Sequence, residues 1–140
     1  MARWLRKDNL MLSQNKTFSI FNKTKGKLPS LPFEAIKKTI LGEKFELSLV
    51  FTNSIEMKKL NLSYRNLNSP TDILSFPLSK KSGEIFICPS ETKKMMTKFK
   101  RDYKNFLAFL FIHGCVHLRG YDHGDKMEKV ELKFRKKFKI

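Results

Sequence analysis

The three histidines of this chain lie close together in sequence, at His113, His117 and His123. Imidazole is the commonest neutral protein ligand for zinc. On an α-helix, His113 and His117 would lie on one face, because residues four positions apart are neighbours. Gly120 can end that helix in a left-handed conformation and let the chain turn back to present His123. The spacing predicts one zinc ion per chain, the alternative being three histidines that are neighbours by coincidence.

Three histidines with an open fourth position are typical of a catalytic zinc, whereas structural zinc sites are usually closed by four protein ligands. Zinc lowers the pKa of a bound water to about 7, which suits hydrolysis of an ester, an amide or a phosphodiester. The protease form of a helical histidine pair is His-Glu-x-x-His, with the glutamate as general base. Here Gly114 occupies the glutamate position. A metalloprotease-like hydrolase is therefore the weaker alternative.

The charge of the chain indicates a polyanionic partner. The 140 residues carry a formal net charge of +16. Such an excess favours RNA, DNA or an anionic membrane surface, although lysines that merely solvate the surface would give the same count. Basic residues are concentrated at 93–101 and 133–139. A phosphodiester is thus the more natural substrate for a zinc site on this chain.

A second group of candidate residues precedes the histidines. Arg65 could bind a phosphate through its planar guanidinium and stabilise charge on a cleaving phosphodiester. The alternative is a helix-end arginine that contacts terminal carbonyls or a nearby aspartate. Thr71 and Asp72 follow Pro70 and are better explained as turn residues that cap backbone amides.

The order of apolar and polar residues predicts the elements that position these groups. Alternation and turn signals predict strands at 17–21, 45–52, 71–78 and 83–88, the last two forming a hairpin and the one at 71–78 largely buried. Helical spacing and caps predict a helix from Pro32 to Gly42 and a second from an N-cap at Ser54 to about Tyr64, with Ile55, Leu60 and Leu62 as its apolar members. Further helices are predicted from Ser90, at about 104–118 and at about 125–137. The predicted fold class is α/β (α+β): one domain with a small mixed sheet of about four strands and about five helices.

The remaining composition bears on domains and compartment. Residues 1–10 show no clear pattern and are interpreted as an N-terminal extension, before a single domain at 11–140. Two cysteines, Cys88 and Cys115, do not make a disulfide framework, and Cys115 is predicted to be a core residue rather than a ligand. No export signal is visible, and the longest apolar run, 106–112, is too short to span a bilayer. We expect a cytoplasmic protein without a membrane partner.

Two motifs together resemble the YbeY family. The first is His113-Gly114-x-x-His117-Leu118-x-Gly120-Tyr121-Asp122-His123; the second comprises Tyr64-Arg65 and Ser69-Pro70-Thr71-Asp72-Ile73-Leu74-Ser75-Phe76-Pro77. Gly83-Glu84-Ile85 resembles the Gly-Asp-Ile strand of the family. The resemblance covers about 45–123. Departures are Asn68 where an aspartate is usual, Cys115 and Arg119 where apolar residues are common, and a basic segment after His123.

The resemblance implies a zinc-dependent, single-strand-specific endoribonuclease that acts in ribosomal RNA maturation and ribosome quality control. It implies that His113, His117 and His123 bind the zinc, that Arg65 is catalytic, and that the partners are single-stranded or ribosomal RNA and the ribosome. A different class stays open: a ribosome-associated RNA-binding factor with a structural zinc, which the net charge would also suit. The nucleophile, water or the RNA's own 2′-hydroxyl, stays open too.

Overall fold

The computed structural model describes residues 11–140, with their side chains from residue 15 onward. Residues 1–10, interpreted above as an extension, lie outside the described residues. The elements follow the order β1 (Met11–Gln14), β2 (Phe18–Asn22), α1 (Phe33–Leu41), β3 (Glu46–Phe51), α2 (Ser54–Arg65), β4 (Ile73–Ser79), β5 (Ser82–Ile87), α3 (Pro89–Met95), α4 (Tyr103–Leu118) and α5 (Asp125–Phe138).

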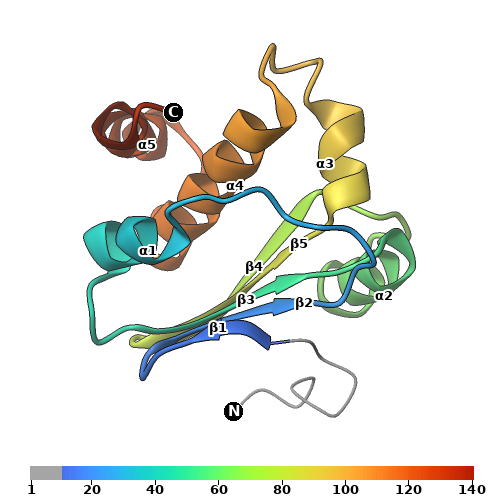
Figure 1. Ribbon diagram of the computed structural model, residues 1–140, viewed down its shortest axis with the longest axis horizontal. Coiled ribbons are helices and arrows are strands. Elements are labelled where there is room, and N and C mark those ends of the chain that lie inside the picture. Colours follow the sequence, from blue (N-terminus) through green and yellow to red (C-terminus); the bar gives the residue numbers. More distant parts are fainter. Residues whose placement is uncertain (1–10) are drawn as a thin grey trace.

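The strands form one mixed sheet in the order β1-β2-β3-β5-β4 (Figure 1). The central strands β2, β3 and β5 are parallel, and an antiparallel strand flanks them on each side. The expected hairpin is present as β4 and β5, with Ile73 paired to Ile87. The α/β class with five helices is confirmed. The sheet has one strand more than the predicted four, because β1 adds to β2 through a short turn.

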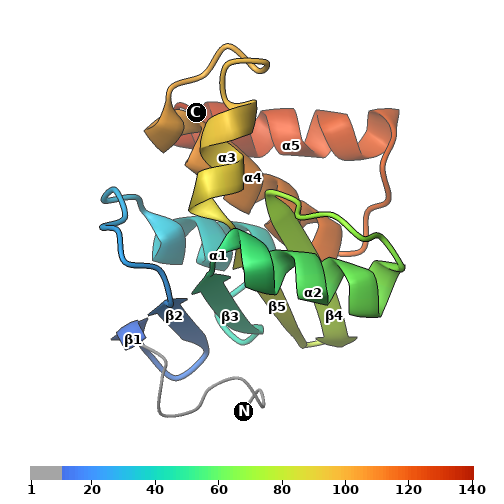
Figure 2. The ribbon, with the colours of Figure 1, turned by 90° about the vertical axis from the view of Figure 1, so that its right-hand side faces the viewer.

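Helices α1 and α4 cover one face of the sheet, and α5 packs on the outer side of α4 (Figure 2). The alternating side chains Leu47, Leu49 and Phe51 of β3 point into this layer, as the sequence pattern predicted. They meet Phe111 and Cys115 of α4. Burial of large apolar side chains here is the main stabilising contribution to the fold. Helix α4 is therefore held firmly against the sheet, which fixes the histidines at its far end.

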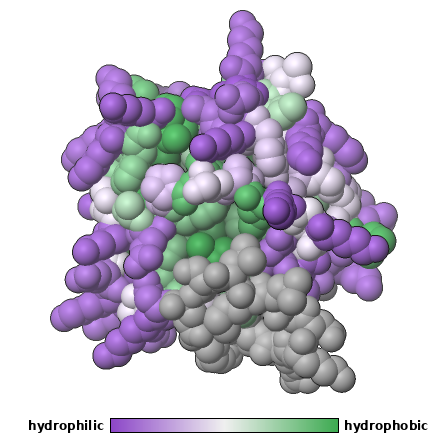
Figure 3. All heavy atoms as spheres, in the orientation of Figure 1, coloured by the Kyte–Doolittle hydropathy of each residue, from purple (hydrophilic) through white to green (hydrophobic). Residues whose placement is uncertain are grey.

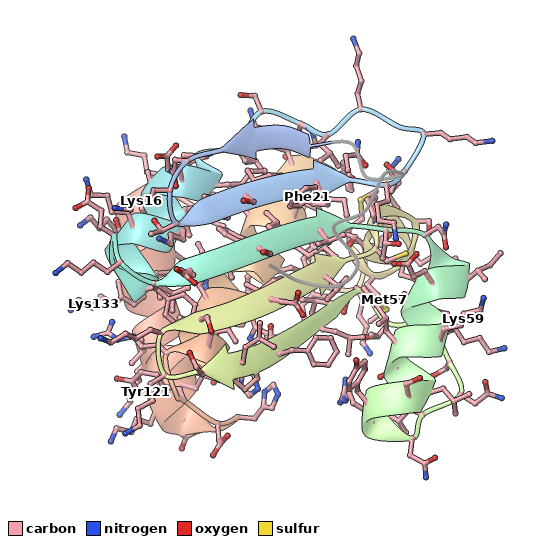
Figure 4. All side chains as sticks on the ribbon, turned by 90° about the horizontal axis from the view of Figure 1, so that it is seen from below. Lys16, Phe21, Met57, Lys59, Tyr121 and Lys133 are labelled. Carbon is pink, nitrogen blue, oxygen red and sulfur yellow. The ribbon has the colours of Figure 1, made fainter. Side chains whose placement is uncertain are left out.

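Helix α2 lies on the opposite face of the sheet (Figure 4). Its buried side chains are Met57 and Asn61, and Met57 packs against Phe21, Val50, Leu74 and Phe86 from the strands. The prediction that Ile55 and Leu62 form its apolar face is wrong, since these side chains are 71% and 45% exposed. The polar Asn61 takes a core position because its side-chain amide donates to the carbonyl of Ser69, which anchors the following loop.

Three details of the sequence-based assignment need correction. The N-cap of α2 is Asn53, whose side chain accepts from the amide of Glu56, and not Ser54. Helix α3 begins at Pro89 after Cys88, with no side-chain cap from Ser90. Strand β4 is an edge strand in which only Leu74 is fully buried, so the expectation of a largely buried strand is wrong.

Other predictions for the core hold. Cys88 and Cys115 are free and buried, and burial raises the pKa of the Cys115 thiol far above its ordinary value. Cys115 is therefore a core residue, as predicted, and points away from the histidine face of α4. Among residues 11–140, no helix combines the length and apolar content needed to cross a bilayer.

Candidate metal centre

The structure brings the three histidine rings together at the C-terminal end of α4. The ring centroid of His123 lies 5.2 Å from that of His113 and 5.7 Å from that of His117. His113 and His117 share one face of the helix, and His123 comes from the loop that follows. Gly120 adopts a positive φ of 113° in that loop, a conformation that costs other residues energy. The predicted turn after the helix is therefore present.

In two of the three imidazoles, the Nδ1 atom is hydrogen-bonded to another part of the protein. Nδ1 of His113 lies 2.7 Å from Oε1 of Glu131 on α5, and Nδ1 of His117 lies 2.9 Å from the carbonyl oxygen of Tyr121. Both partners are acceptors, so each Nδ1 carries the hydrogen and donates it. In the neutral form of each ring, Nε2 is then the unprotonated atom. Metal-binding histidines commonly show this pattern, with the second nitrogen tied to a carboxylate or a backbone carbonyl.

The donor set suits zinc, but the side chains are not yet in the arrangement of a metal site. As placed, no three His, Cys, Asp or Glu side chains of the described residues could hold an ion together. Imidazoles that share a tetrahedral zinc at about 2.1 Å would have centroids about 5 Å apart. The observed separations of 5.2 and 5.7 Å are close to that value. The ring spacing therefore fits a shared zinc ion, and His123 is the exposed member of the three.

Gly114 is required by packing. A Cβ at this position would lie 3.0 Å from Cδ1 of Ile85, 3.0 Å from Oγ of Ser75 and 3.1 Å from Cδ1 of Ile73. Helix α4 therefore packs closely against the β4–β5 hairpin beside its first histidine. A glutamate, which the metalloprotease motif would place here, would require the ends of these side chains to shift. In the sequence, Gly114 was notable only because it replaces the general-base glutamate of the protease motif. The structure gives a packing reason for the glycine.

Asp72 lies at the start of β4, on the side of the histidines. Burial raises the pKa of its carboxyl group, while hydrogen bonds from backbone amides, the Thr71 hydroxyl and the nearby His113 act in the opposite direction. The backbone bonds agree with the predicted turn role of Asp72. Its closeness to His113 is a tertiary feature that no local pattern in the sequence indicates.

Arg65 ends α2 and is exposed to solvent. Its guanidinium makes no hydrogen bond or ion pair with any residue from 15 to 140, so the alternative of a helix-end arginine bound to carbonyls or an aspartate is wrong. The loop 66–72 joins Arg65 to Asp72 and so to the histidine side of β4. The structure records no direct contact between Arg65 and the histidines.

A separate groove of about 780 Å³ lies on the sheet face beside α2. Tyr64, Phe76, Ser48 and Glu84 are among the residues that line it. In Figure 4 this face is seen with Met57 at the α2 end and Lys16 at the far end. The histidines do not line the groove, so this groove and the candidate metal centre are different places.

Glu131 is the residue that sequence analysis missed. Its side chain is only 9% exposed although it is charged, and its only polar partner among the described residues is His113. The signal in the sequence was a glutamate in a lysine-rich helix, four positions after Met127 on the same helical face. That spacing places Glu131 on the buried side of α5 but does not reveal its partner.

Known proteins are similar to this chain in sequence. A family model described as Endoribonuclease YbeY matches residues 12–139. An Endoribonuclease YbeY from Thermotoga maritima is 32% identical over 132 residues, covering 91% of this chain and 84% of the relative. One from Pelagibacter ubique is 36% identical over 120 residues, covering 80% and 73%.

A solved structure is also similar. The solution structure of TM1509 from Thermotoga maritima matches with a TM-score of 0.56 and 34% sequence identity, over 75% of this chain and 72% of that protein. The family model spans almost all of the described residues, including both motifs noted in the sequence. The chain therefore belongs to the Endoribonuclease YbeY family.

Proposed function

We propose that this protein is a zinc-dependent endoribonuclease that cuts single-stranded RNA, with ribosomal RNA as the substrate and the ribosome as the site of action in the cytoplasm. The relatives are named endoribonucleases, which supports RNA cleavage. The observation that carries the proposal is the cluster of three histidine rings with two Nδ1 atoms already tied to acceptors. The net charge of +16 suits a polyanionic substrate.

His113, His117 and His123 would hold one zinc ion through their remaining nitrogens. When bound, the ion would supply a water of lowered pKa and a positive charge beside the scissile phosphate. The chain contributes the orientation: Glu131 and the Tyr121 carbonyl fix which nitrogen of His113 and His117 faces the site. A fixed tautomer removes the cost of reorganising both rings when the site loads.

Arg65 would bind the phosphate of the RNA. Its side chain is exposed and has no partner among residues 15–140, so its donors are available to a substrate. A guanidinium forms paired hydrogen bonds with phosphate oxygens and stabilises the charge that develops during cleavage. Because Arg65 stands on a different helix from the histidines, an RNA strand bound to both would span the edge of the sheet at β4.

Cleavage of a labelled single-stranded RNA by the wild-type protein and by His117→Ala tests the proposal, with the zinc content of both samples measured in parallel. We expect the variant to lose zinc and at least about 100-fold in cleavage rate, because two imidazoles hold zinc poorly. Equal cleavage by both proteins would contradict a zinc ribonuclease and indicate a contaminant. The 3′ ends of the products decide the nucleophile, since a 2′,3′-cyclic phosphate excludes direct attack by water.

The charge also favours a second candidate, an RNA-binding factor with a structural zinc. It requires a wild-type protein that is loaded with zinc, binds RNA and cuts none. RNA binding that survives His117→Ala in a folded protein, together with that result, would select this candidate over the nuclease.

A further inference from the structure

Two arginines meet on one phenylalanine, on the side of the histidine cluster toward the N-terminal end of α4. The guanidinium carbon of Arg101 lies 4.5 Å from the ring centroid of Phe109, and that of Arg135 lies 5.0 Å from the same centroid. Arg101 comes from the loop before α4 and Arg135 from the last turn of α5. Contacts with an aromatic face stabilise a guanidinium and leave its N–H edges available for other partners.

The positive charge at this place is not neutralised by the protein. No carboxylate among the described side chains forms an ion pair with Arg101 or Arg135. Arg101 donates one hydrogen bond to the side-chain oxygen of Asn105. Burial, and then the charge of Arg135, lower the pKa of Arg101. The two guanidinium groups therefore repel each other in a partly desolvated position, which costs energy unless an anion lies between them.

A shallow hollow of about 370 Å³ adjoins the pair, lined by Phe99, Lys100, Arg101, Asp102 and Asn105. The one acidic side chain in it, Asp102, is occupied as the N-cap of α4 and accepts from the amide of Asn105. Lys98 and Lys100 are exposed nearby in sequence. In Figure 3 hydrophilic side chains likewise gather round the rim of the molecule, where these elements lie. The hollow thus offers cationic donors and little competing negative charge.

The arginine pair is aligned with the histidines along the contact between α4 and α5. Phe109 and His113 are four positions apart and share one face of α4. On the antiparallel α5, Glu131 contacts His113 and Arg135, four positions later, contacts Phe109. At a rise of 1.5 Å per residue, the two pairs are separated by about 6 Å along the helices. Figure 2 shows α5 beside α4, the two helices crossing at an angle.

We propose that Arg101 and Arg135 form a second phosphate-binding site, which holds the backbone of the RNA strand beyond the position of cleavage. This rests on the proposed function, because it assumes an RNA substrate. The site would read the sugar–phosphate backbone and no base, since both arginines present N–H donors and Phe109 is covered by them. A strand long enough to reach from the histidines to the arginine pair would bind more tightly than a shorter one.

The test compares Arg101→Gln/Arg135→Gln with the control Lys25→Gln/Lys27→Gln, which removes the same charge from exposed positions in the loop before α1. Two fluorescein-labelled single-stranded RNAs, a 16-mer and a dinucleotide with one phosphodiester, are titrated without metal at several salt concentrations. We expect the arginine variant to lose about tenfold in affinity for the 16-mer and about 1.4 in the slope of log Kd against log salt, the value for two phosphate contacts. The dinucleotide, whose one phosphodiester cannot lie at the histidines and at the arginine pair together, should lose less affinity than the 16-mer.

Equal losses in the arginine variant and the lysine control would overturn the site and leave only a general charge effect. Equal losses for both RNA lengths would also overturn it, because a merely structural role weakens every complex. Arg135→Gln alone, which removes one charge near a helix end, keeps the test valid if the double variant unfolds, with about a threefold expected loss. A zinc-loaded wild type that binds the 16-mer without cutting it contradicts the nuclease and still tests the site. No binding of either RNA by the wild type overturns both.

Discussion

The two regions with candidate catalytic groups are built in opposite ways. On α4, His113 and His117 are half-buried, and each is fixed by a hydrogen bond to a neighbouring element. On α2, Arg65 is exposed at the helix end, with no polar partner among the described residues. The difference shows which task needs rigidity. Ligands of a metal must keep their geometry before the ion arrives, whereas a phosphate-binding arginine can be ordered by the substrate itself.

Of the substitutions that test this comparison, Gly114→Glu is expected to have the largest effect. Gly114→Glu would force a charged side chain against Ile85, Ser75 and Ile73, whose nearest atoms lie only 3.0–3.1 Å from the position that a Cβ would take. We expect a loss of about 3 kcal/mol or more in the free energy of unfolding, from overpacking and from burial of a carboxylate. Denaturant unfolding measures it.

Gly26→Glu is the matched control, because no heavy atom lies within 4 Å of a Cβ at that position. It should change stability by less than about 0.5 kcal/mol. A Gly114→Glu protein as stable as this control would show that α4 can move away from the β4–β5 hairpin. Peptide hydrolysis by such a stable variant would revive the metalloprotease alternative.

Arg65→Ala should separate cleavage from metal binding. We expect a decrease of about 30- to 100-fold in kcat/KM on RNA, the effect of losing a charged hydrogen-bond donor to the phosphate. Zinc content and stability should stay the same, since the side chain is exposed and contacts no metal ligand. Arg65→Lys should recover only part of the rate, because an ammonium lacks the planar pair of donors.

Lys59→Ala is the control for Arg65→Ala, since Lys59 is exposed on the same helix and points away from the sheet in Figure 4. It should leave cleavage within about twofold of the wild type. Loss of zinc from Arg65→Ala would give Arg65 a structural role at the metal centre. The contrast between histidines held by the protein and an arginine ordered by the substrate would then fail.

Local patterns predicted the elements well and their environments less well. The histidine spacing and Gly120 predicted how His123 returns to α4, because helix period and chain reversal are local properties. The burial of Asn61 and the exposure of Ile55 depend on which face of α2 meets the sheet, and the weak apolar pattern of α2 left that undecided. Strand β1 was not predicted, because its pairing with β2 identifies it as a strand and no local pattern reveals that pairing.

The same division applies to the candidate site. His113, His117, His123 and Arg65 could be selected from sequence by residue type, spacing and resemblance. Glu131 could not, since its role depends on how α5 packs against α4, a contact between residues 18 positions apart. Side chains that bear chemistry are thus easier to find in a sequence than the side chains that orient them.

Of the substitutions that test the comparison between the histidines and Arg65, those at Glu131 are expected to have the smallest effect. They also test it most directly. Glu131→Gln keeps an acceptor beside Nδ1 of His113 and removes the charge, whereas Glu131→Ala removes both. We expect the zinc affinity to fall by about tenfold in the first variant and up to about 100-fold in the second, the range for residues that orient metal ligands. Competition with a chromophoric chelator measures the affinity.

Glu128→Gln serves as the control, because Glu128 is exposed on the same helix and makes no ion pair with any residue from 15 to 140. It should keep wild-type zinc affinity. A change in the visible spectrum of the cobalt-loaded Glu131→Gln protein would report an altered ligand geometry, which general destabilisation would not produce. Unchanged zinc affinity in both Glu131 variants would mean that α5 only covers α4, and that the histidines are positioned by their own helix.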